Sequence, residues 1–173
     1  MEKKNIMISG MPGVGKTSLL KAILSQIPLS VGGFVSEEIR EGGERVGFSL
    51  KTLDGKGGIL AHKRIPTSLR FGNYYINLLD LEKIAVQSIE DAIANKDLIV
   101  IDEIGKMELL SPLFRQATLR ALDCPKPVLA TLHRGEDPFL NSIRKRADTV
   151  VFWLTKQNRE EVLRKVLSFL REI

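Results

Sequence analysis

The sequence predicts a three-layer α/β/α fold, in which helices cover both faces of a mostly parallel sheet. Short apolar runs rich in branched residues alternate along the chain with segments of helical spacing, which indicates buried parallel strands covered on both sides. One stretch, residues 31–64, interrupts this alternation with an antiparallel pattern. A chain of 173 residues suits one well-buried domain, so we expect a single domain over residues 1–173.

The alternation can be followed in chain order. Residues 5–9 form an apolar run that stops at a glycine-rich turn, as a buried strand does. Apolar residues then recur at helical spacing over 19–27, and Pro28 closes this helix. Three further runs predict strands and two apolar stripes predict helices: 98–101, 128–132 and 150–154 for the strands, 81–93 and 162–170 for the helices.

Two details refine the last strand and the last helix. Phe152 and Trp153 lie in the final apolar run, so we expect both to be core residues. Asn158 stands three residues before Glu161, which predicts a capping box at the start of the last helix.

Residues 31–64 carry no helical pattern. Short alternating runs at 33–36, 45–50 and 58–61 are separated by the turn pairs Gly42-Gly43 and Asp54-Gly55. This segment therefore predicts an antiparallel hairpin insertion that follows the second strand.

Composition and charge limit the kind of protein. The 43% hydrophobic and 27% charged residues are typical of a globular chain, not a disordered one. No apolar run reaches the ~20 residues that a membrane span requires, and no apolar signal core follows the first residues, so we expect a cytoplasmic protein without a membrane partner. The single cysteine, Cys124, permits neither an internal disulfide nor a multi-cysteine zinc site.

The net charge of +5 favours anionic partners, either phosphorylated small molecules or nucleic acid. Nucleic acid is the less favoured of the two because the basic residues are scattered and do not alternate with aromatic residues. The sequence leaves the oligomeric state open, with a monomer as the simplest expectation.

The strongest motif lies between the first strand and the first helix, where residues 10–17 match the pattern G-x-x-x-x-G-K-[ST]. In such a loop, glycines let successive backbone N–H groups point at phosphate oxygens, and the following helix presents its positive end. Lys16 would reach the β- and γ-phosphates, and the Thr17 hydroxyl would hold Mg²⁺. The motif predicts a nucleoside triphosphate site formed by Gly10, Met11, Pro12, Gly13, Val14, Gly15, Lys16, Thr17 and Ser18.

A second motif places two carboxylates at the end of the strand predicted at 98–101. Asp102 fits the Walker B position, which contacts Mg²⁺ directly or through water. Glu103 would then lie beside the γ-phosphate, where a carboxylate can orient or deprotonate a water molecule. An adjacent Asp-Glu pair favours a hydrolase over a small-molecule kinase, whose acceptor is not water.

With both motifs placed, residues 102–109 read Asp-Glu-Ile-Gly-Lys-Met-Glu-Leu, which is longer than a generic Walker B strand. This run resembles the thermophilic-type P-loop nucleoside-triphosphatase family, which includes the human cancer-related nucleoside-triphosphatase. Further matching stretches extend the resemblance over nearly the whole chain: 33–40, 45–48, 77–78 and 127–131.

The resemblance implies a P-loop NTPase fold of the additional-strand type, with the strand at 128–132 between the phosphate-loop strand and the Asp102 strand. It implies slow, Mg²⁺-dependent hydrolysis of ATP, GTP, CTP and UTP to diphosphates, with weak base discrimination. By the family pattern, nucleotide contacts extend from the loop to Asp102, Glu103, Ile104, Gly105 and Lys106.

This sequence departs from the family pattern at two positions. Met11 stands where relatives often have Pro or Glu, which matters little because the loop binds through its backbone. Tyr75 stands where the pattern has glycine, so the resemblance assigns no role to residues 72–77.

Three further sets of residues each allow two interpretations. Lys106 either places a positive charge near the transferred phosphate or is a solvated lysine. Thr131 and His133 end the strand that flanks the loop; they either sense the γ-phosphate or, the favoured interpretation, are ordinary hydrogen-bonded strand-end residues. Arg144 and Arg146 either supply an arginine finger or, as is more common, belong to a charged helix face.

Two other functions compete with hydrolysis. A nucleotide or nucleoside kinase uses the same loop but needs an acceptor pocket and an arginine-rich lid, for which Arg64, Arg70 and 144–146 are candidate parts without a clear lid segment. The other alternative is a nucleic-acid-binding module, which only the net charge of +5 favours. The sequence does not identify the physiological substrate or the base-contacting residues, because the loop binds phosphates that all nucleotides share.

Overall fold

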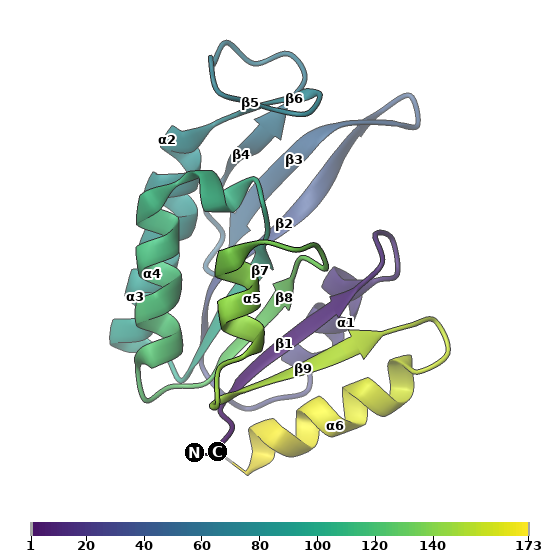
Figure 1. Ribbon diagram of the computed structural model, residues 1–173, viewed down its shortest axis with the longest axis vertical. Helices are drawn as coiled ribbons and strands as arrows, with labels where there is room; N and C mark the ends of the chain where they lie inside the picture. Colours follow the sequence, from purple (N-terminus) through teal and green to yellow (C-terminus); the bar gives the residue numbers. More distant parts are fainter. Residues whose placement is uncertain (1, 173) are drawn as a thin grey trace.

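The computed structural model describes residues 2–172, and within this range nine strands form one sheet in the order β5-β6-β4-β3-β2-β7-β8-β1-β9 (Figure 1). Neighbouring strands from β2 to β9 pair in parallel. These strands are β2 (Val31–Glu41), β7 (Leu98–Ile104), β8 (Val128–Leu132), β1 (Asn5–Gly10) and β9 (Thr149–Leu154). The position of β8 between β1 and β7 is the one that the additional-strand type requires.

Helices cover both faces of this parallel region, which confirms the three-layer fold (Figure 1). On one face, α1 (Lys16–Leu24) and α6 (Arg159–Arg171) pack side by side and share a core with β1. On the other face lie α3 (Gln87–Asn95), α4 (Pro112–Asp123) and α5 (Pro138–Arg144). Among the described residues, no helix combines the length and the apolar character needed to cross a bilayer.

The predicted antiparallel insertion is present and is longer than a single hairpin. Strands β3 (Glu44–Thr52) and β4 (Gly57–His62) continue the sheet beyond β2, and the long β2–β3 hairpin projects from the body of the protein (Figure 1). Beyond them, β6 (Tyr74–Ile76) and β5 (Arg70–Phe71) form a small second hairpin. Strands of two or three residues are too short for an alternating pattern to show in the sequence.

The apolar stripe at 81–93 belongs to a longer helical segment. It begins with α2 (Leu78–Asp80), continues through the π-helical stretch η1 (Leu81–Val86) and ends with α3. Asn77 caps this segment, because its side-chain oxygen accepts a hydrogen bond from the Asp80 N–H at 3.1 Å. A short 3₁₀ turn, η2 (Glu108–Leu110), follows β7.

Two sequence predictions near the C-terminal helix are wrong. Asn158 does not cap α6: its side-chain oxygen accepts from the Thr155 N–H at 2.7 Å, within the turn that precedes the helix. Trp153 is 49% exposed, because β9 is the edge strand and its side chains alternate. Phe152 faces α6 and packs against Phe169 at a ring distance of 6.1 Å, whereas Trp153 points away from that helix.

Candidate active site

The predicted phosphate loop connects the end of β1 to the start of α1. Gly13 and Gly15 have φ angles of 78° and 102°, a left-handed region that favours glycine. Gly10 has no room for a side chain, since a Cβ there would lie 2.8 Å from the Leu154 carbonyl oxygen. The glycines of the motif are therefore required by the backbone path of the loop.

The structure brings Thr17 and Asp102 together, as the two motifs predict. The Thr17 hydroxyl donates to Oδ2 of Asp102 at 2.8 Å, and the Thr131 hydroxyl donates to Oδ1 at 2.6 Å. Burial raises the pKa of the Asp102 carboxyl, while both hydroxyl hydrogen bonds act in the opposite direction. Thr131 is thus a hydrogen-bonded strand-end residue, and its partner is the carboxylate at the centre of the site.

Thr17 and Asp102 fit a magnesium ion by their chemistry. Both supply hard oxygen ligands, and Mg²⁺ in nucleotide sites commonly takes one or two protein ligands beside substrate phosphates and water. Residues 2–172 contain no cluster of three or more His, Cys, Asp or Glu side chains arranged to hold a metal. A metal at this position would therefore depend on the phosphates of a bound nucleotide.

Glu103 lies next to Lys16, as expected for a carboxylate at the γ-phosphate end of the site. Lys16 Nζ is 3.5 Å from Oε2 of Glu103 and donates to the Gly10 carbonyl oxygen at 3.2 Å. Burial raises the pKa of Glu103, and the positive charge of Lys16 partly offsets this effect. A carboxylate with a raised pKa accepts a proton more readily, which suits the general base that the sequence predicts.

A second carboxyl group, Glu108, was not predicted as a site residue. It is only 4% exposed, at the start of η2, and it approaches Glu103 across Gly105. A Cβ on Gly105 would lie 2.7 Å from Glu103 Oε1 and 3.2 Å from Glu108 Oε1, so this position has no room for a side chain. Burial, together with the nearby negative charge of Glu103, raises the pKa of Glu108 well above its ordinary value.

A hollow of about 430 Å³ opens beside these carboxyl groups. Lys106 and His133 form part of its wall together with Glu103, so the structure places Lys106 near the site, although within residues 2–172 its side chain forms no hydrogen bond or ion pair. His133 Nδ1 accepts from the Gly135 N–H at 2.9 Å. Burial and the nearby charge of Lys106 lower the pKa of His133. Ile104, in contrast, packs its side chain in the core and does not line the hollow.

The structure separates the two arginines proposed as a finger. Arg144 donates to the carbonyl oxygens of His133 and Gly135 at 2.6 and 2.9 Å, so it braces the loop after β8. Arg146 pairs with Asp123 and Asp148 at the amino end of the sheet, away from the phosphate loop. The 144–146 cluster is therefore not a single functional unit.

A cation that sequence analysis missed reaches the loop from its other side. Arg159, the first residue of α6, donates to the Ser18 hydroxyl at 3.2 Å and to the Gly15 carbonyl oxygen at 3.5 Å. No sequence pattern identifies this contact, because 144 positions separate Arg159 from Gly15. It depends on α6 packing beside α1.

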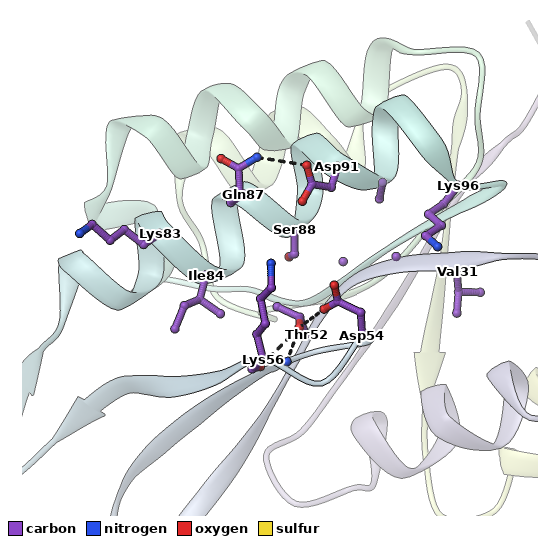
Figure 2. Close-up of a pocket in the computed structure, with 13 residues that line it drawn as sticks. Val31, Thr52, Asp54, Lys56, Lys83, Ile84, Gln87, Ser88, Asp91 and Lys96 are labelled. Atoms are coloured by element: carbon purple, nitrogen blue, oxygen red, sulfur yellow. Dashed lines mark hydrogen bonds between the residues drawn. The ribbon is translucent and has the colours of Figure 1, made fainter.

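Another hollow, of about 420 Å³, lies at the amino end of β2, and none of the predicted site residues line it (Figure 2). The amino end of β2, the β3–β4 turn and the helical segment from η1 to α3 form its walls. Figure 2 shows Thr52 bonded to Asp54 and Gln87 bonded to Asp91 (3.1 Å), so much of its polar lining is already paired. The predicted site residues are thus gathered at the carboxyl ends of β1 and β7, where parallel α/β sheets bind their ligands.

Comparison with known proteins extends these observations over the whole chain. The NTPase family model matches residues 5–167. A nucleoside-triphosphatase THEP1 of Thermotoga sp. (strain RQ2) is 51% identical over 166 residues, which cover 96% of this chain and 95% of that protein.

Two solved structures have the same fold. The crystal structure of THEP1 from the hyperthermophile Aquifex aeolicus matches with a TM-score of 0.87 at 35% identity, covering 96% of this chain and 98% of that one. The solution structure of a human cancer-related nucleoside triphosphatase matches with a TM-score of 0.79 at 34% identity, covering 98% of each chain.

Proposed function

This chain belongs to the NTPase family and is a nucleoside-triphosphatase; from that premise we propose that it hydrolyses ATP, GTP, CTP and UTP alike, in a reaction that requires Mg²⁺. The products are the nucleoside diphosphate and inorganic phosphate. The observation that carries the proposal is the partly buried pairing of Glu103 with Lys16 beside the Thr17–Asp102 contact.

Each part of the site has a role in this reaction. The N–H groups of the 10–18 loop and Lys16 hold the β- and γ-phosphates. Thr17 and Asp102 would hold Mg²⁺, which when bound would supply positive charge to offset the charge that develops on the leaving diphosphate. Glu103 takes a proton from water as the water oxygen bonds to the γ-phosphorus and the bond to the β,γ-bridging oxygen breaks.

Weak base discrimination follows from the way in which the loop binds. Its N–H groups and Lys16 recognise phosphate oxygens, which are the same in all four nucleotides. The predicted site residues between Gly10 and Ser18 and between Asp102 and Lys106 all belong to this phosphate end of the substrate. Binding energy therefore comes mainly from groups that do not differ between bases.

A phosphate-release assay without any acceptor tests the proposal. We expect similar turnover of all four triphosphates, complete loss on chelation of Mg²⁺, and severe loss in Lys16→Ala. Lys21→Ala is the matched control, because this half-exposed lysine of the same helix pairs with Glu37 outside the site. Activity confined to one base, activity that persists without metal, or transfer of phosphate to an added nucleoside monophosphate would each contradict the proposal.

A further inference from the structure

Arg159 is a positively charged group at the phosphate loop to which neither motif assigns a role. Its guanidinium group contacts two parts of the loop–helix junction: the Gly15 carbonyl oxygen, at 3.5 Å, and the Ser18 hydroxyl, at 3.2 Å. A guanidinium group has five N–H donors, and these two contacts use one on Nη1 and one on Nη2. Among the described residues, 2–172, no hydrogen bond occupies the remaining donors, so they can bind an additional acceptor.

The charge of Arg159 is not neutralised by the protein. Within residues 2–172, no carboxylate lies within ion-pair distance of its guanidinium group, in contrast to Arg146, which pairs with both Asp123 and Asp148. The side chain is half-buried, and so it lies over the loop instead of extending into water. A half-buried, unpaired cation beside a phosphate-binding loop favours an anionic ligand.

The turn before α6 holds Arg159 in this position. Asn158 closes the turn by three hydrogen bonds. Its side chain accepts from the Thr155 N–H at 2.7 Å and donates to the Trp153 carbonyl oxygen at 2.8 Å, and its backbone N–H donates to the Thr155 hydroxyl at 3.2 Å. This arrangement replaces the capping box that the sequence predicts. Its effect is to fix the start of α6, and therefore the origin of the Arg159 side chain, relative to β9.

The sheet order places Arg159 and Glu103 on opposite flanks of the loop. The loop follows β1, which has β8 and then β7 on one side and β9 on the other (Figure 1). Glu103 belongs to β7, whereas Arg159 follows β9. Since Lys16 and Glu103 mark the γ-phosphate end, Arg159 lies on the side toward which the α-phosphate and the nucleoside extend.

We propose that Arg159 binds the α-phosphate of the bound nucleotide and so completes recognition of the triphosphate chain. The inference rests on the proposed function, because it takes the placement of the β- and γ-phosphates from that site. A guanidinium group forms strong charge-assisted hydrogen bonds with phosphate oxygens. The α-phosphate is also common to all nucleotides, so this contact adds affinity without adding base discrimination.

The α-phosphate is bound equally before and during cleavage of the bond between the β- and γ-phosphates. Loss of such a contact raises KM and leaves kcat nearly unchanged. We expect Arg159→Gln to raise KM for ATP and GTP by about the same factor, roughly 10- to 100-fold. The product ADP keeps the α-phosphate, so its affinity should fall by a similar factor.

Inorganic tripolyphosphate separates this role from a contact with the nucleoside, because it carries three phosphates and no base or ribose. The experiment measures KM for ATP and GTP, the inhibition constant of tripolyphosphate, and ADP affinity by calorimetry. Arg164→Gln is the matched control, since Arg164 is an exposed arginine of the same helix. Arg159→Lys keeps the charge but loses the planar pair of donors, and it should weaken binding less than Arg159→Gln.

The expected result is parallel weakening of ATP, GTP, ADP and tripolyphosphate in Arg159→Gln, with kcat retained and Arg164→Gln unchanged. Weakening of the nucleotides alone would overturn the proposal in favour of a base or ribose contact. Unchanged affinities, or equal losses in Arg159→Lys and Arg159→Gln together with a lower melting temperature, would show a structural role instead. ADP affinity needs no turnover, so it remains informative even if the wild-type protein fails the four-nucleotide assay.

Discussion

Thr131→Val removes one hydroxyl group from the centre of the site while nearly conserving the shape of the side chain. Thr131 is fully buried on β8, and its hydroxyl donates to Oδ1 of Asp102 at 2.6 Å. The other carboxylate oxygen of Asp102 accepts from Thr17. Valine would remove the hydrogen bond to Oδ1 and keep the one from Thr17 to Oδ2.

The size of the effect follows from this geometry. A hydrogen bond to a charged acceptor contributes about 1.5–3 kcal/mol, and loss of a group that orients a metal ligand typically lowers metal affinity about 10- to 100-fold. We therefore expect Thr131→Val to raise the Mg²⁺ concentration needed for half-maximal activity by about one to two orders of magnitude. The rate at saturating Mg²⁺ should fall much less.

The assay is phosphate release from ATP at a series of Mg²⁺ concentrations. Thr118→Val is the matched control, because Thr118 is equally buried but its hydroxyl has no hydrogen-bond partner within residues 2–172. This control should keep the wild-type Mg²⁺ dependence and lose no stability. If Thr131→Val also keeps the wild-type Mg²⁺ dependence, the assignment of Asp102 as a magnesium ligand oriented by Thr131 is refuted.

Two further predictions concern stability. Gly33→Ala should destabilise the fold by at least about 3 kcal/mol, or roughly 6–12 °C in melting temperature, because Gly33 has a φ of 110° and a Cβ there would lie 1.9 Å from the Val100 carbonyl oxygen. Gly43→Ala is the control, because a Cβ at Gly43 would lie in open space. Equal melting temperatures for the two variants would contradict the argument. Glu108→Gln should stabilise the protein increasingly as the pH rises from about 4.3, because burial raises the pKa of Glu108 in the folded state and its ionisation then opposes folding. Melting temperatures of the variant and the wild type between pH 4.5 and pH 8 check this, and a pH-independent difference would count against it.

The parallel half of the fold could be predicted from the sequence because its strands are buried on both faces. Continuous apolar runs such as those of β1, β7 and β8 need no partner to be recognised. The edge strand β9 shows the limit of this reasoning, since an apolar run does not tell which of its side chains a helix covers. For that reason the sequence predicts Trp153 in the core, although α6 covers only the other face of the strand.

The candidate site was predictable where a motif joins residue type to position in the chain. Lys16, Thr17, Asp102 and Glu103 come together as the two motifs indicate. Contacts between distant segments were not predictable, because no local pattern encodes which helix packs beside which. Arg159 is the clearest case, since its position over the loop depends on the packing of α6 against α1.

The central claim is that Glu103 acts on the attacking water and not on nucleotide binding. Single-turnover phosphate release from ATP, measured beside ATP affinity in Glu103→Gln, tests it most directly. We predict affinity close to that of the wild type and phosphate release slower by about 10²- to 10⁴-fold. Phosphate release at the wild-type rate, or a loss confined to ATP affinity, would contradict the claim.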